Sequence, residues 1–186
     1  VEIDKAKRKA RSEGRDLIDL GVGDPDLPTP NHIVEKLAEA AREPKNQKYA
    51  LDQGMPALRQ AIADWYKSRF NVNLDPEAEI LPLIGSKEGI AHLPLAFVNP
   101  QDYVLVPDPG YPPYRGSTIL ADGQAYSMPL LADNSFLPDF KEIPIKIKKQ
   151  ARLMFLNYPN NPTAGIANKA FYQKVINFAF KYNTLI

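Results

Sequence analysis

The sequence of 186 residues contains no cysteine, which excludes disulfide bridges, thiolate metal sites and a thiol nucleophile. It also lacks an excess of either charge, since 23 Lys and Arg stand against 22 Asp and Glu. This balance excludes the broad basic surface of a dedicated nucleic-acid-binding protein. The most apolar stretch, 89–98, is too short to span a bilayer and contains His92 and Pro94. We therefore expect neither a nucleic-acid partner nor a membrane partner.

Clustered metal ligands and a secretory signal are lacking as well. His32 and His92 flank no group of carboxylates at ligand spacing, so no metal site is expected. The first residues, 1–5, are charged rather than apolar, which favours a cytoplasmic protein. The sequence starts with Val, and residues 184–186 have the pattern of a strand that is just beginning. We therefore expect a segment of a longer protein.

Proline, in contrast, is abundant, with 18 residues, about twice its usual share of roughly 5%. Short apolar runs predict strands at 80–84, 103–106, 124–128 and 152–156, and residues 184–186 begin another. Helical patterns predict helices at 2–13, from Thr29-Pro30, from Pro56, after 85–89, at 114–121 and at 169–181, whereas 130–150 is expected to be a long loop. This alternation predicts an α/β fold with a mostly parallel sheet flanked by helices.

Two smaller expectations concern side chains outside the predicted loops. The helix from Pro56 carries its apolar residues on one face, Trp65 among them, so Trp65 is expected in the core. Four lysines follow one another closely in the predicted long loop, and we expect them to form a solvated face: Lys141, Lys146, Lys148 and Lys149.

Three loops that follow predicted strands carry unusual residues, and parallel α/β sheets bind ligands beyond the carboxyl ends of their strands. The first, Gly85-Ser86-Lys87, precedes a helix, so free backbone N–H groups and the helix dipole would favour an anion there. Ser86 adds a hydroxyl group and Lys87 a positive charge. The alternative is that Ser86 only caps the helix.

The second loop, 108–114, contains three prolines that restrict its backbone. A rigid loop after a strand could hold Tyr111 as a flat platform for a planar ligand. It is equally consistent with this pattern that Tyr111 and Tyr114 only close the edge of the core.

The third loop, 157–163, contains three amide side chains and two X-Pro steps. Asn161 could donate a hydrogen bond to an anionic oxygen on a ring. The Asn161–Pro162 bond is also a candidate cis peptide, because X-Pro bonds tolerate the cis form. Taken alone, this segment is also consistent with an ordinary turn.

Taken together and in order, five motifs resemble those of the class I/II (fold-type I) pyridoxal-phosphate aminotransferases: residues 21–26, Tyr49 with Gln53-Gly54, residues 85–87, residues 108–112 and residues 157–163. Within that family the segments 23–30 and 84–90 most resemble the LL-diaminopimelate aminotransferase group. The resemblance implies the fold-type I large domain in truncated form. Residues 1–30 would be an N-terminal arm with a substrate-binding turn, and residues 31–186 the N-terminal part of the cofactor-binding large domain.

The resemblance also implies roles for single residues toward pyridoxal 5'-phosphate. Ser86 and Lys87 would hold the cofactor phosphate, Tyr111 would stack on the pyridine ring, and Asn161 would hydrogen-bond the phenolic oxygen of the ring. Tyr49 would reach the phosphate in the neighbouring subunit, which implies a homodimer.

Substrate contacts follow from the same resemblance. Gly23 would contact the substrate carboxylate through its backbone, and Lys87, Tyr111 and Asn161 would also face the substrate. The lysine that forms a Schiff base with the cofactor in this family is expected beyond Ile186. No catalytic residue is therefore expected in this segment, which should be inactive alone.

The implied activity is transfer of an amino group between an amino acid and a 2-oxo acid, with LL-diaminopimelate or glutamate as the preferred amino donor. Two alternatives stay open: an aspartate-, alanine- or aromatic-type aminotransferase, and a non-catalytic binding or regulatory module with the same fold. One residue departs from the family pattern, because Ala164 stands where many members have glycine. Since alanine disfavours positive φ, the turn should differ there or use Gly165 in that role.

Overall fold

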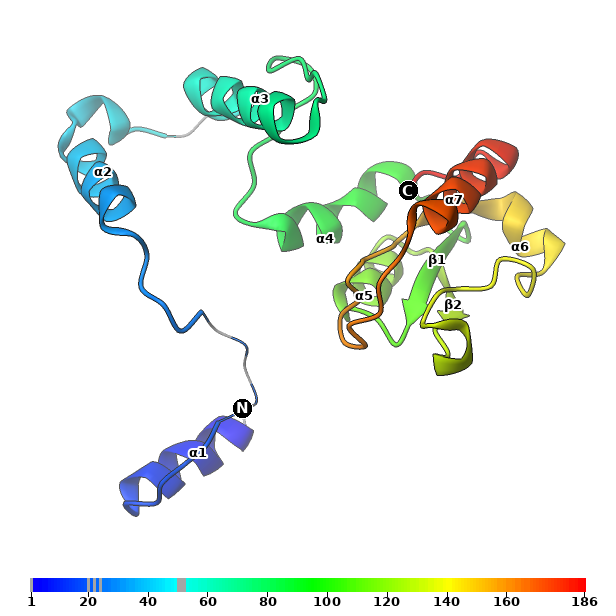
Figure 1. Ribbon diagram of the computed structural model, residues 1–186, viewed down its shortest axis with the longest axis horizontal. Coiled ribbons are helices and arrows are strands. Elements are labelled where there is room, and N and C mark those ends of the chain that lie inside the picture. The colour runs from blue at the N-terminus through cyan, green and yellow to red at the C-terminus, as the bar shows by residue number, and fades with distance from the viewer. Residues whose placement is uncertain (1, 20, 22, 24, 50–52) are drawn as a thin grey trace. The chain divides into compact units, whose positions relative to one another are not determined.

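The computed structural model describes residues 2–19, 21, 23, 25–49 and 53–186, and the chain divides into two compact units, 1–52 and 53–186. The first unit contains α1 (Glu2–Ser12), α2 (Asn31–Arg42) and the short 3-10 helix η1 (Pro44–Asn46), as Figure 1 shows. The first helix ends before Gly14, whose φ of +72° suits glycine. The second begins later than predicted, because Pro30 has an extended ψ of 136° and is itself the N-cap, so Thr29 does not cap this helix.

The second unit alternates helices with strands, as predicted. In chain order it contains α3 (Pro56–Phe70), α4 (Ser86–Phe97), β1 (Tyr103–Asp108), α5 (Pro113–Leu120), β2 (Gln124–Pro129), η2 (Ala132–Asn134), α6 (Ile145–Gln150), β3 (Ala151–Met154) and α7 (Lys169–Tyr182). The helix predictions from Pro56 and for residues 114–121 and 169–181 are therefore confirmed within a residue or two of their ends. The helix expected after 85–89 exists, but it begins earlier, at Ser86, because residues 86–89 are already helical.

The three strands form a parallel sheet in the order β2-β1-β3. Leu185 forms an isolated parallel bridge with Leu153 of β3, so residues 184–186 contact the sheet at one position, next to β3. The chain passes from β1 through α5 to β2 on one side, and then crosses to β3 on the other side. The strand order therefore reverses between β1 and β3, and open α/β sheets bind their ligands at such a switch point.

Both faces of the sheet are covered by helices, which is the usual arrangement for parallel strands. Leu105 belongs to a buried cluster with Val175 and Phe178 of α7, whereas its neighbours Val104 and Val106 belong to a second cluster on the opposite face. Ile90 and Leu93 of α4 and Tyr114 of α5 pack in this second cluster. The α/β prediction is thus confirmed, and the two loops that flank the switch point follow adjacent strands.

Three sequence-based expectations about this unit are wrong. The segment 80–84 is not a strand, since Pro82 has no N–H group for a sheet ladder. Residues 130–150 are not one loop, because η2 and α6 lie within them. Trp65 is 53% exposed, because neither of the buried clusters found in the described residues includes a residue of α3.

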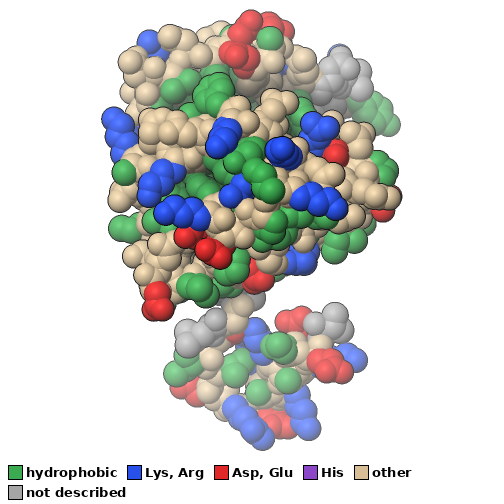
Figure 2. All heavy atoms as spheres, turned by 90° about the vertical axis from the view of Figure 1, so that its right-hand side faces the viewer, with side chains coloured by type: hydrophobic (Ala, Val, Ile, Leu, Met, Phe, Trp, Pro, Cys, Tyr) green, Lys and Arg blue, Asp and Glu red, His purple; other side chains and the backbone are tan. Residues whose placement is uncertain are grey.

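The solvated lysine face, in contrast, is confirmed in part. Figure 2 shows Lys and Arg side chains standing out on the face of the second unit that carries α6 and α7. Lys141, Lys146 and Lys149 are exposed, and Lys148 is half-buried.

Candidate functional site

The N-terminus of α4 is built around Gly85, which is the N-cap of this helix and has a φ of +81°. No side chain caps the helix, and Ser86 is its first residue, so the alternative that Ser86 serves as the cap is wrong. A Cβ atom at Gly85 would meet nothing within 4 Å, which shows open space in front of the helix. The side chains of Ser86 and Lys87 are exposed there.

Backbone donors at this helix end are not consumed within the chain. Among the described residues, the amide groups of Gly85, Ser86 and Lys87 donate no hydrogen bond to any protein atom. Helix N-termini with free N–H groups attract anions, and the dipole of a helix adds to this attraction. The arrangement therefore suits a phosphate group.

The loop after β1 places Tyr111 close to the sheet. Its backbone turns tightly at Gly110, where a Cβ atom would lie 2.4 Å from the carbonyl oxygen of Pro107. Tyr111 is half-buried and contacts Tyr114 edge to face, with ring centres 5.8 Å apart. Tyr114 is buried and stacks on Phe155, and burial raises the pKa of its hydroxyl above the ordinary value. Tyr114 thus closes the core as the alternative proposed, while part of Tyr111 stays open to solvent.

Lys87, in the first turn of α4, meets Tyr111 from the loop after β1. The Nζ atom of Lys87 lies 5.7 Å from the centre of the Tyr111 ring, within the range of a cation–π contact. A positive charge at the helix end and an aromatic face are therefore next to each other. A hollow of about 290 Å³ adjoins the same loop, with Tyr111, Tyr114 and Arg115 among its lining residues.

The loop after β3 is held by its own hydrogen bonds. The amide of Asn160 donates to the carbonyl of Gly165 at 2.8 Å, and the amide of Ala164 donates to the carbonyl of Asn160 at 2.7 Å. The Asn160 side chain is buried and donates to the Thr163 hydroxyl at 2.9 Å. Asn161 is exposed, so its amide group can reach a ligand.

The Asn161–Pro162 peptide bond is cis, as predicted. Because β1 and β3 are adjacent and parallel, the loops that carry Tyr111 and Asn161 leave the sheet at the same edge. Tyr158, in the same loop, donates its hydroxyl hydrogen to the carbonyl of Phe136 at 3.1 Å, and burial raises its pKa to about 12.

Gly165 does not supply the positive φ of this turn, so that expectation is wrong. Ala164 itself adopts the left-handed conformation, with a φ of +57°. Gly165 is needed for space instead, since a Cβ atom there would lie 2.8 Å from the Cβ atom of Phe136. The tight hydrogen bond from Ala164 to Asn160 explains why the turn keeps its form without glycine at position 164.

Gly23 and Tyr49 belong to the first unit and are described within it. A Cβ atom at Gly23 would meet nothing within 4 Å, and Tyr49 is 92% exposed. Other parts of their motifs, Val22, Asp24 and residues 50–52, lie outside the described residues.

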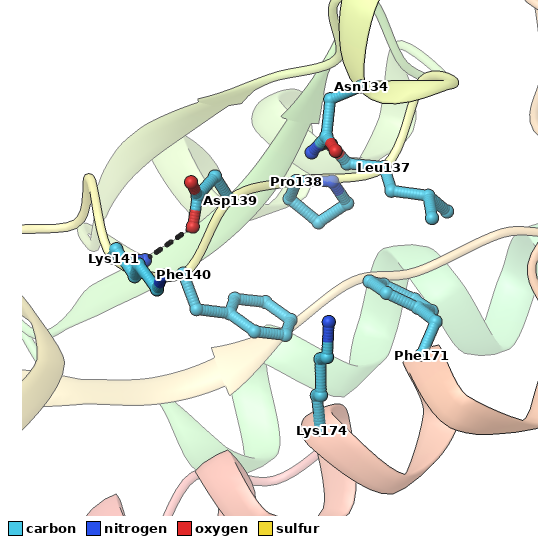
Figure 3. A pocket seen from close by; sticks show the side chains of 8 residues that line it. All are labelled: Asn134, Leu137, Pro138, Asp139, Phe140, Lys141, Phe171 and Lys174. Carbon is cyan, nitrogen blue, oxygen red and sulfur yellow. Dashed lines mark hydrogen bonds between the residues drawn. The ribbon is translucent and has the colours of Figure 1, made fainter.

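A second hollow, of about 370 Å³, lies between the 134–141 segment and α7. Figure 3 shows Phe140, Phe171 and Lys174 pointing into it. The residues that line it include neither Lys87 nor Tyr111, so it is not the candidate site. Within the described residues, no group of three or more His, Asp or Glu side chains could hold a metal ion, and no helix is long and apolar enough to cross a membrane.

Sequence analysis did not identify two further residues that shape the site. Phe155 fixes Tyr114 by stacking, and an aromatic residue at the end of a buried strand gives no signal of this contact. Glu88 accepts a hydrogen bond from the amide of Ile84 at 2.7 Å. A glutamate at the third helical position is a known signal for such a bond to the backbone before a helix.

These features fit a ligand with an anionic group and a planar ring, as pyridoxal 5'-phosphate has. The open space at Gly85 and the three free amides can take the phosphate, and the partly exposed Tyr111 ring beside Lys87 can take the ring.

Comparison with known proteins agrees with this fit. The LL-diaminopimelate aminotransferase of Moorella thermoacetica is 51% identical over 186 residues, which are 100% of this chain and 48% of that protein. That of Desulforudis audaxviator is 54% identical over 100% of this chain and 47% of its own length. The chain thus spans about half the length of the curated relatives it matches.

Solved structures give the same picture. Apo-BacF from Bacillus subtilis superposes with a TM-score of 0.91 and 43% identity, over 98% of this chain and 46% of that one. A probable N-succinyldiaminopimelate aminotransferase from Thermus thermophilus superposes with a TM-score of 0.89 and 40% identity, over 98% of this chain and 49% of that one. The profile of the family described as aminotransferase class I and II matches residues 15–186. The chain therefore belongs to this family, whose members use pyridoxal 5'-phosphate.

Proposed function

We propose that this chain is the N-terminal part of an aminotransferase that moves an amino group between LL-diaminopimelate or glutamate and a 2-oxo acid. The observation that carries this proposal is the meeting of Lys87 with Tyr111 beside the uncapped N-terminus of α4. The identity of about half of all residues with two LL-diaminopimelate aminotransferases supports the choice of substrate. Residues 31–186 would belong to the cofactor-binding large domain, and residues 1–30 to an arm with a substrate-binding turn.

The phosphate of pyridoxal 5'-phosphate would be bound at α4. Ser86 would donate its hydroxyl hydrogen, Lys87 would supply a positive charge, and the free amides of residues 85–87 would donate to the remaining oxygens. A phosphate carries up to two negative charges, so both the charge of Lys87 and the helix dipole stabilise it.

The ring would lie against Tyr111, with Asn161 at its edge. Stacking on a tyrosine held by a rigid loop restricts the ring to one plane. Asn161 would donate a hydrogen bond to the phenolic oxygen of the ring and so fix the rotation within that plane. Together these two contacts orient the ring, and they exclude water from the face that Tyr111 covers.

Gly23 would bind the substrate carboxylate through its backbone, while Lys87, Tyr111 and Asn161 would also face the substrate. Tyr49 would complete the phosphate site of a neighbouring subunit, which makes a homodimer part of the proposal. A tyrosine that is 92% exposed in a polar loop suits such a contact. When bound, the cofactor supplies an electron sink that lets the amino group leave one substrate and join another.

The test is an assay of the full-length protein with LL-diaminopimelate and 2-oxoglutarate, in which the release of glutamate is measured. We expect turnover that depends on added pyridoxal 5'-phosphate. Replacing Asn161 with Ala should lower turnover strongly, because the ring loses its edge contact. Turnover of aspartate, alanine or an aromatic amino acid without turnover of LL-diaminopimelate would overturn the substrate choice. A protein that binds the cofactor but transfers no amino group would be the binding module instead.

A further inference from the structure

Glu88 holds the turn in front of α4 from inside the helix. Its Oε2 atom accepts a hydrogen bond from the backbone amide of Ile84 at 2.7 Å, and its own amide donates to the carbonyl of Gly85 at 3.3 Å. Glu88 thus bonds to the chain on both sides of the Ile84–Gly85 peptide. The negative charge also lies in the first turn of a helix, where the dipole favours it.

The choice of Ile84 as donor matters for the proposed phosphate site. In the common capping box, a glutamate at the third helical position accepts from the amide of the N-cap residue itself. Here the N-cap is Gly85, and the carboxylate bonds to the amide one residue earlier. The amide of Gly85 therefore stays free, together with those of Ser86 and Lys87, in the described part of the chain.

Packing alone does not fix this turn. The side chain of Ile84 is 94% exposed, so it is not anchored in any core. Leu83 gives some support, because its Cδ1 atom would lie 2.6 Å from a Cβ atom at Gly89 and hence lies over the first turn of α4. Between Leu83 and Ser86, the bond to Glu88 is the contact that orients the backbone.

We propose that Glu88 is a positioning residue for cofactor phosphate binding. By holding the amide of Ile84, it sets the positive φ at Gly85 and directs three successive free amides to one point. This inference rests on the proposed function, because it needs a phosphate at α4. It adds a residue that does not touch the cofactor and acts only through the backbone.

A matched control exists in the same unit. Glu79 accepts a hydrogen bond from the amide of Asp75 at 2.8 Å, also four residues back and also at an exposed turn. Glu79→Ala removes a bond of the same kind at a position to which no role in the site is assigned. Glu88→Gln keeps an acceptor oxygen at position 88, and Glu88→Ala removes it.

The experiment measures the affinity of the full-length protein for pyridoxal 5'-phosphate and for pyridoxal, which lacks the phosphate. We expect Glu88→Ala to weaken binding of the phosphorylated compound about tenfold, equivalent to about 1.4 kcal/mol, and to leave pyridoxal binding unchanged. Glu88→Gln and Glu79→Ala should bind both compounds as the unchanged protein does. Hydrogen exchange at Ile84 in the cofactor-free protein should become faster in Glu88→Ala only.

Two results would overturn the inference. One is an unchanged affinity of Glu88→Ala for pyridoxal 5'-phosphate, and the other is an equal loss for both compounds, which would show general damage. Should Glu88→Ala fail to fold, Glu88→Asp serves in its place, because its shorter side chain withdraws the acceptor from Ile84. If the unchanged protein binds no pyridoxal 5'-phosphate, the proposed function itself fails, and this outcome is distinct from both others.

Discussion

Tyr114 and Phe155 stack with their ring centres 4.6 Å apart and their planes at 16°. Tyr114 lies in α5 just after the loop that follows β1, and Phe155 follows the last residue of β3. The stack therefore joins the two strands between which the sheet order reverses. Because Tyr111 contacts Tyr114 edge to face, the stack also supports the residue proposed to hold the cofactor ring.

Tyr114→Ala should destabilise the full-length protein by about 3–5 kcal/mol, as truncation of other buried aromatic side chains does. Tyr114→Phe keeps the stack, and the hydroxyl of Tyr114 has no hydrogen-bond partner among the described residues. It should therefore change the free energy of unfolding by less than about 1 kcal/mol. Unfolding in urea measures both variants. A large decrease in the free energy of unfolding of Tyr114→Phe would show that the hydroxyl, rather than the ring, stabilises the protein.

Gly110→Ala should distort the Tyr111 loop, because the new Cβ atom would lie 2.4 Å from the carbonyl oxygen of Pro107. We expect the free energy of unfolding to fall by about 1–3 kcal/mol, which is typical of overpacking, and cofactor binding to weaken. Gly116→Ala is the matched control, since nothing lies within 4 Å of a Cβ atom there and the residue is in α5. It should stabilise the protein by about 0.5–1 kcal/mol. Thermal unfolding of both variants checks the contrast.

Ala164→Gly should stabilise the protein by about 0.4–1 kcal/mol, because residue 164 has a φ of +57° that glycine adopts without strain. The neighbouring change, Gly165→Ala, should cost about 1–3 kcal/mol, since its Cβ atom would lie 2.8 Å from that of Phe136. Midpoints of urea unfolding compare the two. Equal effects at both positions would contradict this account of the turn.

The hydroxyl of Tyr158 should lose its proton at a higher pH than that of an ordinary tyrosine. Burial raises its pKa from 10.0 to about 12, so the folded state favours the neutral hydroxyl. The resulting stabilisation is fully present below pH 10.0 and is lost as the pH rises through about 12. The ultraviolet absorbance of tyrosinate should show a component that titrates near pH 12 and that Tyr158→Phe removes. The free energy of unfolding should also fall less steeply in alkali for this variant.

Much of the fold could be predicted because the apolar runs were unambiguous. Residues 103–106 and 124–128 form strands, and the motif order led to the family that comparison confirms. The segment 80–84 was wrongly predicted as a strand, because its apolar residues were given more weight than Pro82. The helix α6 was not predicted, because its six residues, in which Ile and Lys alternate at first, are too few to show a clear helical period.

The residues of the candidate site were proposed from sequence motifs, but their contacts could not be predicted. The meeting of Lys87 with Tyr111 depends on how α4 and α5 pack on one face of the sheet, which no local pattern encodes. Ala164 shows the converse case, where hydrogen bonds within its own loop hold a conformation that the residue type disfavours. The roles of Ser86, Asn161, Gly23 and Tyr49 toward the cofactor and substrate stay predictions.

The two faces of the sheet differ in what they carry. The helices α4 and α5, with the glycine-led turn and the tyrosine loop, belong to one face, whereas α6 and α7 pack on the other. Core substitutions beneath α7 can nevertheless reach the site through the 157–163 loop, because Tyr158 packs edge to face on Phe171 of α7. A redesign of that side for thermal endurance should therefore keep this aromatic contact.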